Sequence, residues 1–180
     1  MSRFLFLRDS SKKWIFLTEK MEKSKDFVVN LMEKMGRKIK FLGGKKFFQE
    51  LSFIEASMTN ENINVLYPSC YSQKRVSLRF RIFLEKEMGR HTLIIILLIA
   101  TLPFSAILGI LPGPNIIFWT ELFMLYIYLK GIKGLKALSK RANLIPDETL
   151  GRWEMDEKNE ESMKELMEKF SIENLDLLKE

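Results

Sequence analysis

The sequence predicts a mainly α-helical membrane protein, a two-helix transmembrane hairpin with a small N-terminal α+β flank built from a β-hairpin and helices. Two apolar segments, residues 92–111 and 116–129, contain one formal charge, Glu121, and are separated by a Pro-Gly-Pro-Asn turn at residues 112–115. Short aromatic and aliphatic runs near the N-terminus indicate strands. Because the hairpin uses about forty of the residues, neither flank is long enough to bury a large core.

The N-terminal flank, residues 1–90, begins with two predicted strands at residues 3–8 and 14–18, which are joined by turn-forming residues. A two-stranded hairpin is marginally stable by itself and needs a helix or a further strand to pack on. Residues 63–67 alternate in polarity and are the candidate for that third strand.

Three helices are expected in the same flank. Apolar residues at helical spacing predict a helix over residues 19–42 that stops at Gly43-Gly44. A second helix follows, with a packing stripe formed by Phe47, Phe48, Leu51 and Ile54. The third, over residues 72–89, is apolar on one face and basic on the rest, so we expect it to lie in the membrane interface or to pack against the flank of the hairpin.

The hairpin itself is predicted from length and uniform apolarity. The first transmembrane helix, residues 91–111, has an apolar part of roughly 30 Å, which matches a hydrocarbon core. The second, residues 116–136, reaches that length only if Lys130 and Lys133 extend their ammonium groups to the headgroups. A buried hairpin of a soluble protein is disfavoured, because these residues are apolar on every side.

Charge distribution predicts the topology. Residues 1–145 carry 24 Lys/Arg against 11 Asp/Glu, whereas residues 146–180 carry 5 against 12. Basic residues flank both apolar segments and the turn has none, so both termini are expected on the same side, in the mitochondrial matrix or the bacterial cytosol. Anionic lipid rather than nucleic acid is the expected partner of these cations. The predicted lipid-facing basic residues are Arg79, Arg81, Lys86, Arg90, Lys130 and Lys133.

The remaining segment, residues 137–180, changes from basic to acidic. Its apolar residues Leu166, Phe170, Leu175 and Leu178 are too sparse to build a core. We therefore expect this tail to be helical or partly disordered.

Two ionisable residues are candidates for an ion or proton site. Glu121 lies within the second apolar segment, where an unpaired charge is costly, so it is protonated, paired or exposed to water. It is either a proton or cation site or a neutral carboxyl hydrogen-bonded to Thr120 or to a backbone carbonyl. His91, at the start of the first segment, is either a proton shuttle or an interfacial polar residue.

Pro103, inside the first apolar segment, frees a backbone carbonyl one turn earlier and is expected to kink the helix. The chain has one histidine and one cysteine, Cys70, which fits a reducing compartment. It shows neither a phosphate-binding glycine loop, nor a metal-spaced cluster, nor a nucleophile next to a base. We therefore expect no enzymatic activity, no cofactor and no metal.

Several segments together resemble the mitochondrial potassium/proton exchange-related family over residues 3–140. They are Phe4-Leu5-Phe6-Leu7, Ile63-Asn64-Val65-Leu66-Tyr67-Pro68, His91, Leu102-Pro103 and, most specifically, Leu111-Pro112-Gly113-Pro114-Asn115 followed by Phe118. Pro112, Pro114 and Asn115 form the turn motif, and Pro103 the kink.

The resemblance implies potassium/proton exchange across the mitochondrial inner membrane, or support of that exchange. Two helices cannot enclose an ion pathway, so a subunit or regulator that works in a homo-oligomer or a larger membrane complex is favoured over a stand-alone transporter. Potassium and protons are the expected ions if exchange is direct. The alternative is a hairpin protein that wedges into one leaflet or acts as a scaffold, with no transport activity, or a membrane-anchored enzyme.

Overall fold

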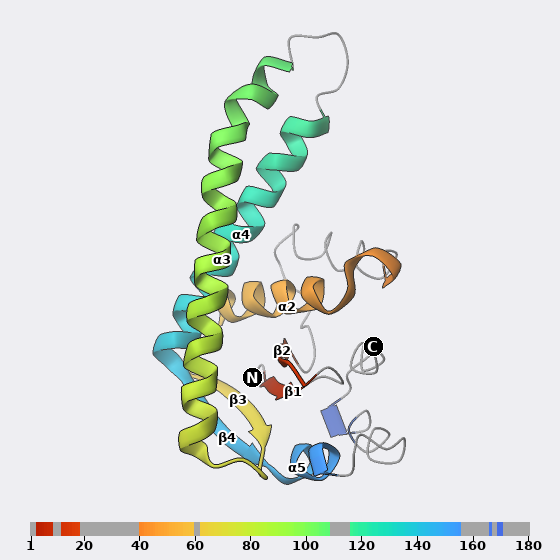
Figure 1. Ribbon diagram of the computed structural model, residues 1–180, viewed down its shortest axis with the longest axis vertical. Coiled ribbons are helices and arrows are strands. Elements are labelled where there is room, and N and C mark those ends of the chain that lie inside the picture. The colour runs from red at the N-terminus through yellow and green to blue at the C-terminus, as the bar shows by residue number, and fades with distance from the viewer. Residues whose placement is uncertain are drawn as a thin grey trace.

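The computed structural model describes residues 3–8, 12–18, 40–59, 62–108, 116–155, 166 and 169–170. Two long helices, α3 and α4, stand side by side and extend beyond a small domain that contains a sheet and two further helices (Figure 1). Residues 19–39 of the helix predicted over residues 19–42, the turn at residues 112–115 and the far C-terminus lie outside the described residues. In chain order the elements are β1 (Arg3–Arg8), β2 (Trp14–Thr18), α2 (Lys40–Met58), β3 (Ile63–Pro68), α3 (Gln73–Leu108), α4 (Ile116–Arg141), β4 (Ala142–Asp147) and α5 (Glu148–Met155).

The sheet has four strands in the order β2-β1-β3-β4. The predicted hairpin is confirmed, because β1 and β2 pair antiparallel. The predicted third strand is also confirmed, and β3 lies parallel to β1. The fourth strand, β4, pairs parallel with β3 from Ile63↔Ala142 to Pro68↔Asp147. Since β3 precedes the helical hairpin and β4 follows it, residues from both sides of the hairpin form one sheet.

Alternation along β1 gives the sheet two buried faces. Phe4 and Phe6 point to one face, where they stack against Phe16 and Trp14 of β2. On that face lies the larger core, to which α2, α3 and α4 contribute residues such as Phe53, Phe80 and Leu135. Leu5 and Leu7 point to the opposite face and form a second core with residues of the C-terminal segment: Leu150, Trp153, Leu166 and Phe170.

The predicted structure of the C-terminal segment was therefore wrong in part. Residues 142–147 form a strand, and α5 follows it as a short helix against the sheet. Leu166 and Phe170, expected to be too isolated for a core, are fully buried there. Asp147 caps α5, its carboxylate accepting hydrogen bonds from the backbone N–H groups of Thr149 and Leu150. The C-terminal segment therefore packs on the N-terminal strands and forms the second core together with them.

Two predicted helix ends are also absent. α2 passes through Gly43-Gly44 without a break, because its packing face later in the helix outweighs the intrinsic cost of about 1 kcal/mol for each glycine. α3 runs through Gly89 as one helix of 36 residues, because the change from basic to apolar sequence does not alter backbone geometry. The basic part of α3 does not lie apart from the domain; its apolar residues Val76, Phe80 and Leu84 pack on the sheet.

The far part of α3 is the most apolar region of the molecule. Within the described residues, α3 alone is long and apolar enough to cross a membrane, and only 17% of its most apolar window is buried. α4 packs along it but carries Glu121 within its apolar part and Lys130 and Lys133 just after that part. Large apolar side chains of both helices are exposed, among them Leu93, Ile96, Leu97, Phe104, Ile107, Ile117 and Trp119.

Candidate functional site

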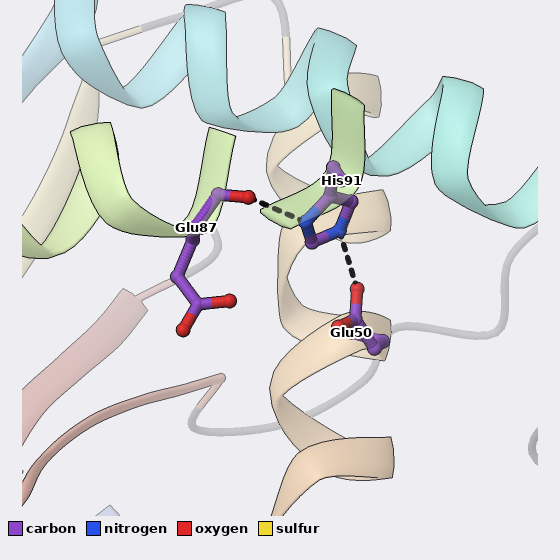
Figure 2. Close-up of side chains that lie close together, drawn as sticks. All are labelled: Glu50, Glu87 and His91. Carbon is purple, nitrogen blue, oxygen red and sulfur yellow. Dashed lines mark hydrogen bonds and ion pairs between the residues drawn. The ribbon is translucent and has the colours of Figure 1, made fainter. Parts of the chain in front are cut away.

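His91 lies at the point where α2, α3 and α4 meet, and its side chain is completely buried (Figure 2). Its Nδ1 is 2.8 Å from the backbone oxygen of Glu87, one turn earlier on α3. Its Nε2 is 2.6 Å from Oε2 of Glu50, which comes from α2. His91, expected at a membrane boundary, is therefore buried and hydrogen-bonds α3 to α2.

Arg90 completes a network of four charged or ionisable side chains. Its guanidinium forms an ion pair with Oε1 of Glu50 and a second, at 2.8 Å, with Oε2 of Glu87. Both carboxylates are largely buried, and Arg90 itself is only 31% exposed. Arg90 was expected to face lipid headgroups, but two buried carboxylates from α2 and α3 hold it inside the domain.

Aromatic rings and a glycine close the site around His91. The ring of Phe53 from α2 and that of Tyr128 from α4 each meet the imidazole edge to face, at 5.8 and 5.1 Å between centroids. Gly131 of α4 provides the remaining space, since a Cβ there would lie 2.8 Å from Nε2 of His91. The site therefore forms only when all three helices are assembled.

The chemistry of this network favours a proton over a metal ion. Glu50, Glu87 and His91 each place one possible ligand atom within 4.8 Å of the others. However, Arg90 already occupies the carboxylates, and the 2.6 Å between Nε2 and Oε2 is a hydrogen-bond distance with no room for an ion between the two atoms. A divalent ion would also place two further positive charges next to the guanidinium.

Glu121 makes a second polar contact between the two long helices. Its Oε2 accepts a hydrogen bond from the hydroxyl of Ser105 on α3, and that hydroxyl also contacts the backbone oxygen of Leu102 at 3.0 Å. Ser105 is buried between the helices, whereas Glu121 is partly exposed. The hydrogen-bond partner that the structure gives Glu121 is therefore a serine across the hairpin.

Comparison with known proteins identifies the family. A family model described as mitochondrial K+-H+ exchange-related matches residues 5–141, about three quarters of the chain. The chain belongs to this family. No curated protein and no solved structure matches the chain. The resemblance read from the sequence is thereby confirmed, and membership in this family supports a mitochondrial location.

The matched region includes the whole His91 network and both long helices of this exchange-related chain. The other predicted residues that the structure describes lie on those two helices, and most of them are exposed. Pro103 is exposed within α3, which continues through it. Lys130 lies over the ring of Tyr126, and Arg81 pairs with Glu85 one turn later. The side chains of Arg79, Lys86 and Lys133 are exposed, while Pro112, Pro114 and Asn115 fall outside the described residues.

Sequence reasoning missed Glu50, Glu87 and Ser105 as site residues. Arg90 and His91 each lie one helical turn after Glu87 on α3, three and four residues on, and this spacing places both side chains next to Glu87. Glu50 interrupts the apolar stripe of α2, and a carboxylate at such a position is a signal for a buried partner. Which partner it takes depends on tertiary packing, because His91 is 41 residues away.

Proposed function

We propose that this protein supports mitochondrial potassium/proton exchange as a membrane-inserted subunit or regulator, with α3 and α4 crossing the inner membrane as a hairpin. The observation that carries the proposal is the exposed apolar end of that hairpin, which projects from a domain with two buried cores (Figure 1). A soluble protein rarely exposes so large an apolar surface, and lipid or a membrane partner is its natural environment.

The pairing of β3 with β4 supports the same-side topology. These strands lie directly before α3 and directly after α4, and six residue pairs join them. A sheet with members on opposite sides of a membrane is impossible, so both flanks occupy one compartment. Exposed cations around the base of the hairpin, including Arg79, Lys86 and Lys133, favour the matrix side and contact with anionic lipid.

A subunit or regulator fits better than a stand-alone exchanger. Two helices cannot surround an ion pathway, so transport requires further copies or a larger partner. The contact between Glu121 and Ser105 places one ionisable group in the apolar part of the hairpin, where it would face such a partner or line a shared pathway.

Native gels of mild-detergent extracts test the assembly. We expect the chain, 21.2 kDa alone, to migrate as part of a much larger complex, and the purified chain alone to give no potassium/proton exchange in liposomes. A monomer on the gel would contradict the subunit role. Potassium/proton exchange by the purified chain alone would contradict it too, and would indicate direct transport.

Substitution of Glu121 by glutamine tests the role of the intramembrane carboxyl. The amide can still accept the Ser105 hydroxyl but cannot release a proton. We expect mitochondria with this variant to exchange potassium for protons more slowly while assembly on native gels stays normal. Glu85→Gln is the matched control, because Glu85 is exposed and lies on the part of α3 near the sheet. Normal exchange with Glu121→Gln would exclude the carboxyl from the pathway.

A second function, a hairpin that wedges into one leaflet, is favoured by the short apolar part of α4. Residues 116–129 span about 21 Å as a helix, less than the hydrocarbon thickness. Thiol labelling of Gly113→Cys in a Cys70→Ser background separates the two functions. Labelling only from the intermembrane side is expected for a full crossing, whereas protection from both sides would indicate the wedge.

The native chain provides the control for that labelling experiment. Cys70 lies in the domain and is exposed, so it should react only from the matrix side. Desolvation of the thiol by the surrounding residues, with the Glu154 carboxylate adding to the effect, raises the pKa of Cys70. Labelling at about pH 8 or above is therefore needed for a comparable rate at both positions.

A further inference from the structure

We propose that the contact between His91 and Glu50 is a proton-binding site that fastens α2 to the α3–α4 hairpin, so that loss of one proton loosens this three-helix junction. This inference concerns the fold itself and does not depend on a role in exchange. It begins from the two hydrogen bonds of one imidazole ring (Figure 2).

The first of these bonds fixes where one ring proton must be. Nδ1 lies 2.8 Å from the backbone oxygen of Glu87, and a carbonyl oxygen can only accept. Nδ1 therefore carries a hydrogen. In a neutral imidazole, that assignment leaves Nε2 with a lone pair and no hydrogen.

The second bond then requires another proton. Nε2 is 2.6 Å from a carboxylate oxygen of Glu50, which also has only lone pairs when it is ionised. Two acceptors at that distance repel each other. The contact is stable only if one proton lies between the nitrogen and the oxygen, so the folded site binds one proton more than a neutral histidine and a free carboxylate.

Arg90 indicates which atom holds that proton. Its guanidinium pairs with the other oxygen of Glu50 and with Glu87, which favours ionised carboxylates. Two carboxylates and one guanidinium leave a net charge of minus one in a largely buried site. A proton on Nε2 makes His91 an imidazolium and brings the network to neutrality, which is the arrangement that burial favours.

The surroundings make the junction sensitive to this single proton. The titratable and charged groups that face His91 in the described part of the chain are Glu50 from α2, Glu87 and Arg90 from α3, and the Tyr128 ring from α4. The ring is fully buried, and the backbone of Gly131 closes the space beside Nε2. Without its proton the ring cannot turn to another partner, so α2 must move away.

The only histidine in the chain makes the experiment simple to interpret. Nitrogen NMR of the ¹⁵N-histidine-labelled full chain in lipid nanodiscs reports both ring nitrogens of His91 alone. At about pH 7 we expect both nitrogens to be protonated. A neutral ring at that pH, with Nε2 unprotonated, would overturn the proposal. So would a shift of the Nε2 signal on adding one equivalent of Zn²⁺, because it would indicate a metal site.

A variant and its control extend the test. In Glu50→Gln the ring should lose its Nε2 proton at the same pH, whereas Glu85→Gln, which removes a charge from the exposed face of α3, should leave the spectrum unchanged. If Glu50→Gln does not fold, the pH dependence of the wild-type melting temperature decides. The melting temperature should fall as the pH is raised and the bound proton is lost, and His91→Gln should remove most of that fall. An equal fall in His91→Gln would overturn the proposal.

Discussion

Replacing Gly134 with alanine is expected to lower the free energy of unfolding by about 3 kcal/mol, because α2 and α4 touch backbone to backbone at this residue. A Cβ at position 134 would lie 2.7 Å from the carbonyl carbon of Phe53 and closer still to its oxygen. The backbone of α2 cannot give way as a flexible side chain would. The helices must separate, which also pulls Glu50 away from His91.

Gly89→Ala is the control for this prediction. A Cβ at position 89 meets nothing within 4 Å, although the residue lies in the middle of α3. Alanine there should leave stability unchanged or raise it by about 0.5–1 kcal/mol. Urea unfolding of both variants in the same detergent, followed by circular dichroism, measures the difference. Equal stability of the two variants would mean that α2 does not pack against α4 as described.

Replacing Trp153 with alanine is expected to lower the free energy of unfolding by about 3–5 kcal/mol. The indole is fully buried in the second core, between Leu5 and Leu7 of β1 and the C-terminal residues Leu166 and Phe170. Removing it leaves a cavity on the sheet face that α5 covers. The same unfolding experiment measures the loss.

Met155→Ala is the matched substitution on the same short helix. Met155 is 64% exposed, so its removal should change stability by no more than about 0.5 kcal/mol. If Trp153→Ala were as mild as Met155→Ala, the C-terminal segment would not belong to the domain core, and the original prediction of a weakly structured tail would be restored.

Local sequence patterns predicted the elements that depend on local chemistry. The aromatic and aliphatic runs of β1 and β2, and the alternation in β3, follow from side chains that pack on a pleated surface. Sequence patterns did not predict β4, because it contains Asn143 and Pro146, which are uncommon in strands. It tolerates Pro146 since β4 lies at the edge of the sheet, where one side needs no ladder hydrogen bonds.

The site was only partly predictable for a similar reason. His91 was selected because histidine titrates near neutrality and this one stands at the start of an apolar segment. Its environment comes from α2, whose Glu50 has no sequence relationship to it. Burial of the ring also depends on Gly131, because any larger residue on α4 would occupy the same space. Such long-range packing leaves no periodic trace in a single sequence.

The fold also brings together the regions before and after the hairpin, which lie far apart in the sequence. The basic flank and the acidic tail share one sheet, because β3 and β4 pair along their whole length, and Lys169 pairs with Asp147 at 2.8 Å within the C-terminal part. Tyr71 connects the ends further, since its hydroxyl donates to Glu154 at 2.8 Å and accepts from Arg8 at 3.1 Å. The domain therefore holds together the two ends of the hairpin, the start of α3 and the end of α4.

Potassium/proton exchange in isolated mitochondria tests the central proposal most directly. Mitochondria from cells that lack this protein should swell slowly in potassium acetate, and re-expression of the full chain should restore the rate. A chain with the same domain but a shuffled apolar hairpin should not restore it. Unchanged swelling in the absence of the protein would contradict a role in exchange, whatever the position of the hairpin in the membrane.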